Sequence, residues 1–579
     1  MKNNKIQKLN PHRQKNNIRA PGNLIKNELI FMNPKMQHYA GKIFIIAVAF
    51  PFFSIKANAQ RDTTRRQTIE ITSSYKPVLR NPVKINLYAS PIAGDTSRPR
   101  LAYNIPPQNL FFTYQPVSLK PLALAADTAL QLGDRNQLKL GFGSFTTPYV
   151  SGIFSFGDGK KNLANVYGSY ISSRGKINNQ DFSELNVKGT GSLFSEKNET
   201  YAFAAFQQHE YYQYGYNHDL FDFDKGILRR SYQDFSAGIG FRNIAVNDLN
   251  IIYNPHLELH TFSRENKASE TTLLLNIPAE KKFSESVSLK VLASGNFNKY
   301  QLKNSPDHLT NNLFQLAPEL VFYSDMFTFH GGATPSWNNN DVTILPNVYG
   351  EAQLQHNVLS IQAGWIGRYI PNSFRTLSGE NPYMQDPAFL NNTKEVQFYG
   401  GVKATIDKHF TFNAKAAVIT FHDLPLFVND INDEKSFVVR NESKLDNFQI
   451  HGDLNYINQD KFTVTAGLDL NTYSGLQDNE KAWHLYPLKL NGSLRWNAFK
   501  QVLIKGDLVA FSGAKALLSD GSQKNLKGGT DISAGGEFKI TPKFSAWLDF
   551  NNILNSTYER WNNYPVYGLQ VIGGIIIHF

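Results

Sequence analysis

The sequence predicts an all-β fold, a transmembrane antiparallel β-barrel of about 22 strands. Three observations predict it: long segments that alternate apolar with polar or small side chains, aromatic side chains near the ends of these segments, and a final strand that ends at Phe579. Alternation with a period of two is typical of a strand whose two faces differ. Segments of about ten residues match the length that a tilted strand needs to cross a bilayer.

The alternation extends over residues 136–579. The segment 544–551 shows it clearly, because apolar side chains at Phe544, Leu548 and Phe550 alternate with polar or aromatic ones. The same pattern occurs in the segments 286–297, 448–456, 462–470 and 531–540. In all of them the charges fall on the less apolar face, as expected for strands in lipid, where a charge costs about 2 to 4 kcal/mol at mid-bilayer.

The number of strands follows from length. Residues 136–579 comprise 444 residues, and at about 20 residues per strand and connection they hold about 22 strands, within a range of about 16 to 24. Aromatic residues near segment ends fit interfacial girdles: Phe410, Tyr456, Trp496 and Phe550. The candidate external loops are 209–231, 368–394, 422–443, 471–485, 512–529 and 555–568.

Residues 1–59 are predicted to be an upstream extension followed by a signal peptide. The apolar run 43–55 has thirteen residues, fewer than the roughly 20 that a membrane-spanning helix needs. Lysines precede the run and Ala57-Asn58-Ala59 follows it, which predicts cleavage before Gln60. A buried strand or an anchor helix is the alternative interpretation of this run. Export is therefore expected.

The same region carries most of the charge. Residues 1–59 contain ten Lys and Arg and one acid, Glu28, out of a net charge of +11, whereas residues 60–579 contain 49 bases and 47 acids. The basic composition therefore belongs to the leader and does not indicate a nucleic-acid partner. Because more than thirty residues precede Met32, we expect translation to start at Met32 or Met36.

Residues 60–135 are predicted to form a proline-rich periplasmic or lumenal arm. They contain eight of the 26 prolines. Each proline lacks a backbone N–H, so long helices and central strands do not fit there. The chain also has no cysteine, which excludes disulfides, a thiol nucleophile and Cys-ligated metal sites. We expect no cofactor, and stability that comes from a closed, hydrogen-bonded barrel.

The C-terminus shows a more specific pattern. The turn Asn551-Asn552-Ile553-Leu554-Asn555 and Tyr558 precede a polar, aromatic loop and a last strand that ends in Phe. This hairpin resembles the last hairpin of TonB-dependent receptors, and the ending resembles the barrel-assembly signal of outer-membrane barrels. The resemblance assigns that signal to five residues on one face of the strand: Leu569, Val571, Ile575, Ile577 and Phe579.

The resemblance has a limit before the barrel. TonB-dependent receptors carry a plug domain of well over a hundred residues, and residues 60–135 are too short and too rich in proline for it. A plugless relative is therefore expected. One segment resembles the energy-coupling box of these receptors, although a short alternating stretch also arises by coincidence: Thr68, Ile69, Glu70, Ile71 and Thr72.

The run 209–224 is rich in tyrosine and aspartate. Its tyrosines could stack on a ligand and its acids could hold a cation, while an interfacial girdle that leads into a solvated loop is the alternative. The acids lack the spacing of a calcium loop. The candidate ligand contacts are Tyr211, Tyr212, Tyr214, Tyr216, Asp219, Asp222 and Asp224. No hydrolase, metalloprotease or P-loop motif is present, so no enzyme activity is expected.

The sequence thus predicts an outer-membrane barrel, resembling TonB-dependent receptors, for uptake or passage of an unidentified solute. The alternative is a structural or interaction barrel that transports nothing and anchors a periplasmic or surface partner. The expected location is the cell outer membrane. The expected partners are outer-membrane lipid, the barrel-assembly machinery, and TonB or a surface lipoprotein.

Overall fold

The computed structural model describes residues 136–579 except 266, 356–357, 407–408 and 459–460. All of these belong to the second of two compact units, Ser73–Phe579. The predicted signal peptide, the arm and the coupling box at Thr68 to Thr72 lie outside the described residues. No helix among the described residues is long and apolar enough to cross a membrane.

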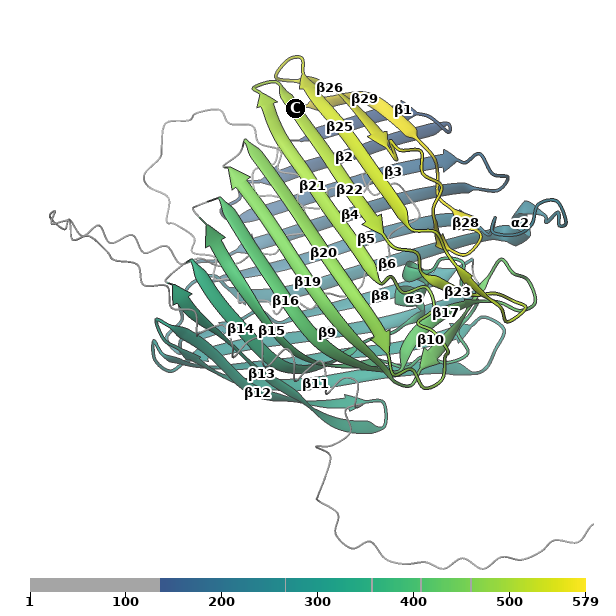
Figure 1. Cartoon of the computed structure of the whole chain (residues 1–579). Coiled ribbons are helices and arrows are strands. Elements are labelled where there is room, and N and C mark those ends of the chain that lie inside the picture. The colour runs from purple at the N-terminus through teal and green to yellow at the C-terminus, as the bar shows by residue number, and fades with distance from the viewer. Residues whose placement is uncertain (1–135, 266, 356–357, 407–408, 459–460) are drawn as a thin grey trace, which may run out of the picture. The chain divides into compact units, whose positions relative to one another are not determined.

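The described chain forms a closed antiparallel barrel of 22 strand positions, which confirms the predicted fold class (Figure 1). β7 and β8 share one position, because both pair with β9. The barrel strands are β1 (Gln137–Gly143), β2 (Thr147–Gly157), β3 (Asn162–Arg174), β4 (Asp181–Phe194), β5 (Asn198–Tyr212), β6 (Arg229–Asn243), β7 (Ile251–Tyr253), β8 (His256–Arg264), β9 (Ala268–Lys282), β10 (Val287–Leu302), β11 (His308–Tyr323), β12 (Phe327–Asn338), β13 (Asp341–Gln355), β14 (Leu359–Ile370), β15 (Thr393–Ile406), β16 (Phe410–His422), β19 (Leu445–Asn458), β20 (Phe462–Ser474), β21 (Leu488–Phe499), β22 (Val502–Phe511), β25 (Gly529–Lys539), β26 (Phe544–Asn551) and β29 (Gln570–His578).

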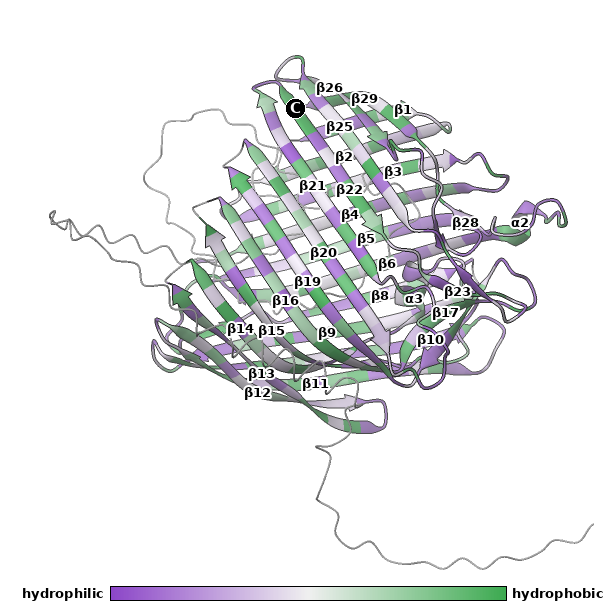
Figure 2. Cartoon of the chain, in the orientation of Figure 1, coloured by the Kyte–Doolittle hydropathy of each residue, from purple (hydrophilic) through white to green (hydrophobic). Residues whose placement is uncertain are grey.

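The two faces of the strands differ as the alternation predicts, and Figure 2 shows green and purple residues alternating along them. In β26, Phe544, Leu548 and Phe550 are exposed on the outside, while Trp547 and Asp549 are buried on the lumenal side. At the C-terminus Ile575 of β29 and the flanking residues Leu569 and Phe579 are exposed, whereas Ile572 and Ile576 of β29 are buried. The role of the outward residues as an assembly signal stays a prediction.

The barrel closes between its first and last strands. β1 pairs with β29 along its whole length, with Gly141 opposite Gly574. Trp547 of β26 covers this junction, because its indole Nε1 donates a hydrogen bond to the Leu140 carbonyl oxygen at 3.1 Å. A side chain at Gly141 would overlap that indole, since a Cβ there would lie 2.3 Å from it. The glycines therefore let the closing strands approach the tryptophan.

The two ends of the barrel have different connections (Figure 1). Asn136 and Phe579 lie at the end with short turns, where the Phe579 N–H donates to the Asn136 carbonyl at 3.1 Å. The long connections all follow strands that run away from that end: 213–228, 371–392, 423–444, 475–487, 512–528 and 552–569. They lie within or close to the six predicted external loops. Their short elements are α2 (Lys225–Leu228), α3 (Phe374–Glu380), β17 (Leu424–Asn429), β18 (Phe437–Glu442), β23 (Lys515–Leu517), β24 (Gln523–Asn525), β27 (Glu559–Trp561) and β28 (Tyr564–Pro565).

Candidate functional site

The long connections meet across the mouth of the barrel and form what we call the loop cap, the connections 213–228, 371–392, 423–444, 475–487, 512–528 and 552–569. The connection 213–228 follows β5, and the other five follow β14, β16, β20, β22 and β26 farther round the barrel, so contacts between 213–228 and the others join distant parts of the rim. Most of the cap shares one buried, largely aromatic cluster with residues of four strands, β6, β8, β9 and β10: Tyr214, Tyr232, Phe262, Ala268, Tyr300, Phe374, Leu377, Tyr383, Met384, Leu390, Phe427, Phe437, Trp561 and Tyr564. The cap is therefore a packed structure and not a set of separate loops.

Three tyrosines from three connections form the centre of this cluster. The rings of Tyr383 and Tyr564 are stacked with centroids 3.7 Å apart, and Tyr214 contacts Tyr564 edge-on at 4.9 Å. The Tyr214 hydroxyl donates to the Pro565 carbonyl at 2.9 Å. Burial raises the pKa of Tyr383 and of Tyr564 well above the usual range. Both phenols therefore stay neutral, and the Tyr564 hydroxyl donates a hydrogen bond to the Lys435 carbonyl.

The connection that contains α3 is tied to the lumenal wall. The Glu270 carboxylate of β9 accepts hydrogen bonds from the backbone N–H groups of Phe374, at 2.5 Å, and Arg375, at 3.3 Å, in the first turn of α3. Farther along, the Asp386 carboxylate accepts from Arg264 at 2.8 Å and from the Tyr300 hydroxyl at 3.0 Å. Charge-assisted bonds of this kind are the stronger ones. Both ends of the connection are thus held inside the barrel.

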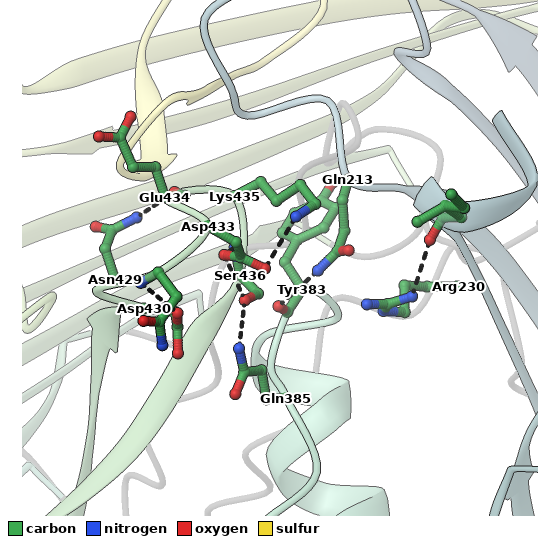
Figure 3. Close-up of polar contacts among 12 residues, drawn as sticks. Gln213, Arg230, Tyr383, Gln385, Asn429, Asp430, Asp433, Glu434, Lys435 and Ser436 are labelled. Atoms are coloured by element: carbon green, nitrogen blue, oxygen red, sulfur yellow. Dashed lines mark hydrogen bonds and ion pairs between the residues drawn. The ribbon is translucent and has the colours of Figure 1, made fainter. Parts of the chain in front are cut away.

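The β17–β18 hairpin continues the cap. Met384 and Phe437 form a parallel bridge, and the Gln385 N–H donates to the Phe437 carbonyl at 2.8 Å. The Gln385 side-chain amide also donates to Ser436 Oγ at 2.8 Å (Figure 3). Backbone and side-chain hydrogen bonds therefore join the β17–β18 hairpin to the connection that contains α3.

Arg560 joins several connections. Its guanidinium donates to the His484 carbonyl at 2.8 Å and lies over the rings of Trp561, at 4.2 Å, and Tyr486, at 4.8 Å. Burial and the Arg560 charge lower the pKa of His484 to about 3. His484 is therefore neutral: its Nδ1 lies 2.8 Å from the Phe427 carbonyl, and its Nε2 accepts from the backbone of Asn562 at 3.4 Å.

The stability of the cap is expected to depend on pH through Glu380. Its Oε1 lies 3.8 Å from Arg560 Nη2, and burial raises the pKa of the carboxyl from 4.5 to about 7, against the lowering effect of the Arg560 charge. The folded cap then keeps a proton that the opened segment releases, so the free energy of opening falls as pH rises from 4.5 towards 7. Because the side chain is 22% exposed, the effect is smaller than for a fully buried carboxyl.

We therefore expect amides of the cap to exchange with deuterium more slowly at about pH 5 than at about pH 7.5, after correction for the intrinsic exchange rate. A Glu380→Gln variant has no proton to release and should lose most of this difference. Equal protection at both pH values in the unsubstituted protein would contradict the prediction.

The lumenal wall below the cap is polar and carries several ion pairs. His451 contacts Asp469 at 2.6 Å and Asp453 at 2.7 Å, as the alternating face of these strands predicts. Lys505 contacts Asp549 at 2.8 Å. A recess of about 260 Å³ is lined by residues that include His256 and Glu258 of β8. Such a wall suits a water-filled lumen.

The tyrosine- and aspartate-rich run is divided by the structure. Tyr211 and Tyr212 end β5, and Tyr214 and Tyr216 are buried in the cap, whereas Asp219, Asp222 and Asp224 are exposed beyond it. Asp224 Oδ1 accepts from the Gly226 N–H at 2.7 Å and caps α2. Within the described residues no three His, Cys, Asp or Glu side chains are placed to hold a metal ion. Ligand contact by these residues stays a prediction.

Several important cap residues had no signal in the sequence. Tyr383, His484 and Arg560 lie in stretches recognised only as loops, and no motif marks them. The last hairpin did give a signal: Asn552 and Asn555 adopt positive φ angles of 48° and 51°, and the amide of Asn552 donates to the carbonyls of Ser556 and Tyr567. The asparagines of the recognised turn thus shape the connection that carries Arg560.

Comparisons with known proteins agree with this geometry. No family model and no curated protein matches the chain, but solved structures do. The FrpB iron transporter from Neisseria meningitidis (F5-1 variant) matches with a TM-score of 0.59 and 12% identity, over 77% of this chain and 83% of that one. The chain has the barrel fold of TonB-dependent receptors.

Two further TonB-dependent receptor barrels, both from Pseudomonas aeruginosa, are similar. The ferripyoverdine receptor of the outer membrane, bound to ferripyoverdine, matches with a TM-score of 0.58 and 11% identity, over 78% of this chain and 73% of that one. A mutant of the ferric enterobactin receptor PfeA matches with a TM-score of 0.57 and 11% identity, over 78% and 81%. These neighbours are receptors and transporters, in line with the fold that the last hairpin predicted.

Proposed function

We propose that this protein is an outer-membrane barrel for uptake or passage of a solute, and that its loop cap closes the outer mouth. The observation that carries the proposal is the closed barrel of 22 positions with an apolar outer face, a polar lumenal wall and a packed cap of long connections at one end. The similarity to barrels described as an iron transporter and as ferric siderophore receptors supports it. The solute itself is not identified.

The proposal includes export and location. The signal peptide directs the chain out of the cytoplasm, and the outward face of the last strand directs it to the barrel-assembly machinery. The expected location is the cell outer membrane, with the short turns and both barrel termini on the periplasmic side. The arm 60–135 joins the barrel at Asn136, on the proposed periplasmic side, and the proposal includes binding of TonB to the box at Thr68 to Thr72. A surface lipoprotein is the other partner proposed, and enzyme activity is not.

Conductance and dye release from liposomes test the proposal. The variants are the full chain and a chain that starts at Asn136, each with an intact cap and with Tyr383→Ala plus Tyr564→Ala. Removing both stacked rings leaves a cavity and should cost about 3 to 5 kcal/mol per ring, enough to loosen the cap. We expect the shortened, loosened barrel to conduct many times more than the shortened barrel with an intact cap.

A reversible disulfide bond across the cap provides the control. The chain has no cysteine, so the paired Gln385→Cys and Ser436→Cys substitutions introduce the only thiols, at side chains now in contact at 2.8 Å. In the loosened barrel an oxidised pair should lower conductance, and a reductant should restore it. If the shortened, loosened barrel conducts no more than empty liposomes, the proposed passage through the lumen is wrong.

A further inference from the structure

The connection 213–228 has two parts with different surroundings. Its first part, up to Tyr216, is buried in the cap. Its second part carries exposed apolar side chains: Leu220 is 72% exposed, Phe221 50% and Ile227 62%. Figure 1 shows α2 at the edge of the capped end of the barrel. We call this exposed part, residues 217–227, the tip.

The tip is anchored by contacts with neighbouring residues of the cap. The Tyr216 ring contacts Phe223 edge-on at 4.9 Å and His218 at 4.1 Å, and the Tyr216 hydroxyl accepts from the Asn179 amide at 3.2 Å. Lys435 of the neighbouring hairpin lies over the Phe223 ring at 4.7 Å. A surface that is ordered before binding loses less entropy when a partner binds. The exposed apolar side chains of the tip are therefore ordered before a partner binds.

The charge of the tip is negative. Asp219, Asp222 and Asp224 lie beside the apolar side chains, and none of them forms an ion pair within the part of the chain that the structure describes. Three basic side chains at or beside the tip already have acidic partners, because Lys225 pairs with Asp181, Arg229 with Glu210 and Lys435 with Asp433. The tip thus combines large apolar side chains with uncompensated carboxylates.

We infer that the tip is a docking surface for a polypeptide segment that is both apolar and basic. Exposed apolar patches with polar rims mark interaction sites, and the carboxylates select the charge of the partner. A phosphate-rich lipid surface carries the same sign of charge as the tip and would be repelled. The inference goes beyond the proposed passage of a solute, and places the partner beside the cap at the outer face.

Binding of defined peptides to the full-length protein in detergent tests the inference. The probe is a dye-labelled peptide of alternating Lys and Leu, and the matched controls replace Lys by Glu or Leu by Ser. We expect only the Lys/Leu peptide to bind, and the triple variant Asp219→Asn, Asp222→Asn, Asp224→Asn to weaken binding about tenfold, with a smaller dependence on salt. Leu220→Ser with Phe221→Ser should weaken binding to a similar extent.

Two controls decide whether the tip is responsible. Asp307→Asn changes an exposed acid in the connection between β10 and β11 and should leave binding unchanged. The substituted tip residues are exposed, so all variants should keep the folded barrel, which gel migration with and without heating checks. Equal weakening by Asp307→Asn, or no weakening by the tip variants, would overturn the inference.

Photo-cross-linking in cells extends the test to the natural partner. A photoreactive residue in place of Phe221 should cross-link one polypeptide through a segment that contains Lys or Arg and apolar residues, and the triple Asp→Asn change should remove the product. Cross-linking to lipopolysaccharide alone, or a product that is insensitive to the three acids, would count against a polypeptide partner.

Discussion

The Gly574→Val substitution is expected to prevent closure of the barrel. A Cβ at Gly574 would lie 1.9 Å from the Leu140 carbonyl oxygen and 2.7 Å from the Gly141 Cα. Both are backbone atoms of β1, so neither can rotate away as a side chain would. We expect a cost above about 3 kcal/mol, beyond the usual range for overpacking, because an open edge would leave backbone groups unpaired in lipid. Loss of the compact, heat-sensitive gel band and a low yield in membranes would show it.

A valine elsewhere in the same sheet provides the matched control. At Gly168 of β3 a new Cβ would have only the Asn186 carbonyl near it, at 4.0 Å, which leaves room for the side chain. Gly168→Val should therefore assemble like the unsubstituted protein. If Gly574→Val and Gly168→Val assemble equally well, the tight junction between β1 and β29 does not determine closure.

The Arg560→Met substitution is expected to loosen the cap while the barrel stays closed. Arg560 is 1% exposed and contacts the His484 carbonyl, the Trp561 ring and Glu380. Methionine keeps much of the volume but leaves that carbonyl and carboxyl without their charged partner. Removing one member of a buried pair costs about 3 to 5 kcal/mol, so amides of 479–486 and 559–567 should exchange about 100-fold faster.

Two comparisons make this prediction specific. Arg440→Met changes an exposed arginine of β18 in the same cap and should alter exchange little. Above the raised pKa of Glu380, about 7, adding Glu380→Gln to Arg560→Met should recover part of the loss, because the neutral amide does not leave a carboxylate charge without a partner. Faster exchange of the barrel strands as well as the cap would show that Arg560 supports the whole fold, contrary to the prediction.

The local pattern of residues was enough to predict the barrel. Side chains in a strand alternate between faces with a period of two, so Phe544, Leu548 and Phe550 marked the outer face of β26 before any partner strand was known. A lipid-facing sheet has to close to pair its edges, and the length of the alternating region then gave about 22 strands. The polar stretches between strands gave the loops, because short and long connections differ in length and composition.

The packing of the loop cap could be seen only in the tertiary structure. Tyr214 bonds to Pro565, 351 residues away, and Gln213 bonds to Tyr383, 170 residues away. The alternation of side chains along a strand does not predict such contacts, because they join loops that are far apart in the sequence. The same reason explains the division of the run 209–224, in which similar residues end either inside the cap or exposed at the tip. The sequence by itself determined the strands, their two faces and the closure of the barrel, because these follow from local alternation. The burial of each loop side chain depended instead on which loops contact one another in the folded protein.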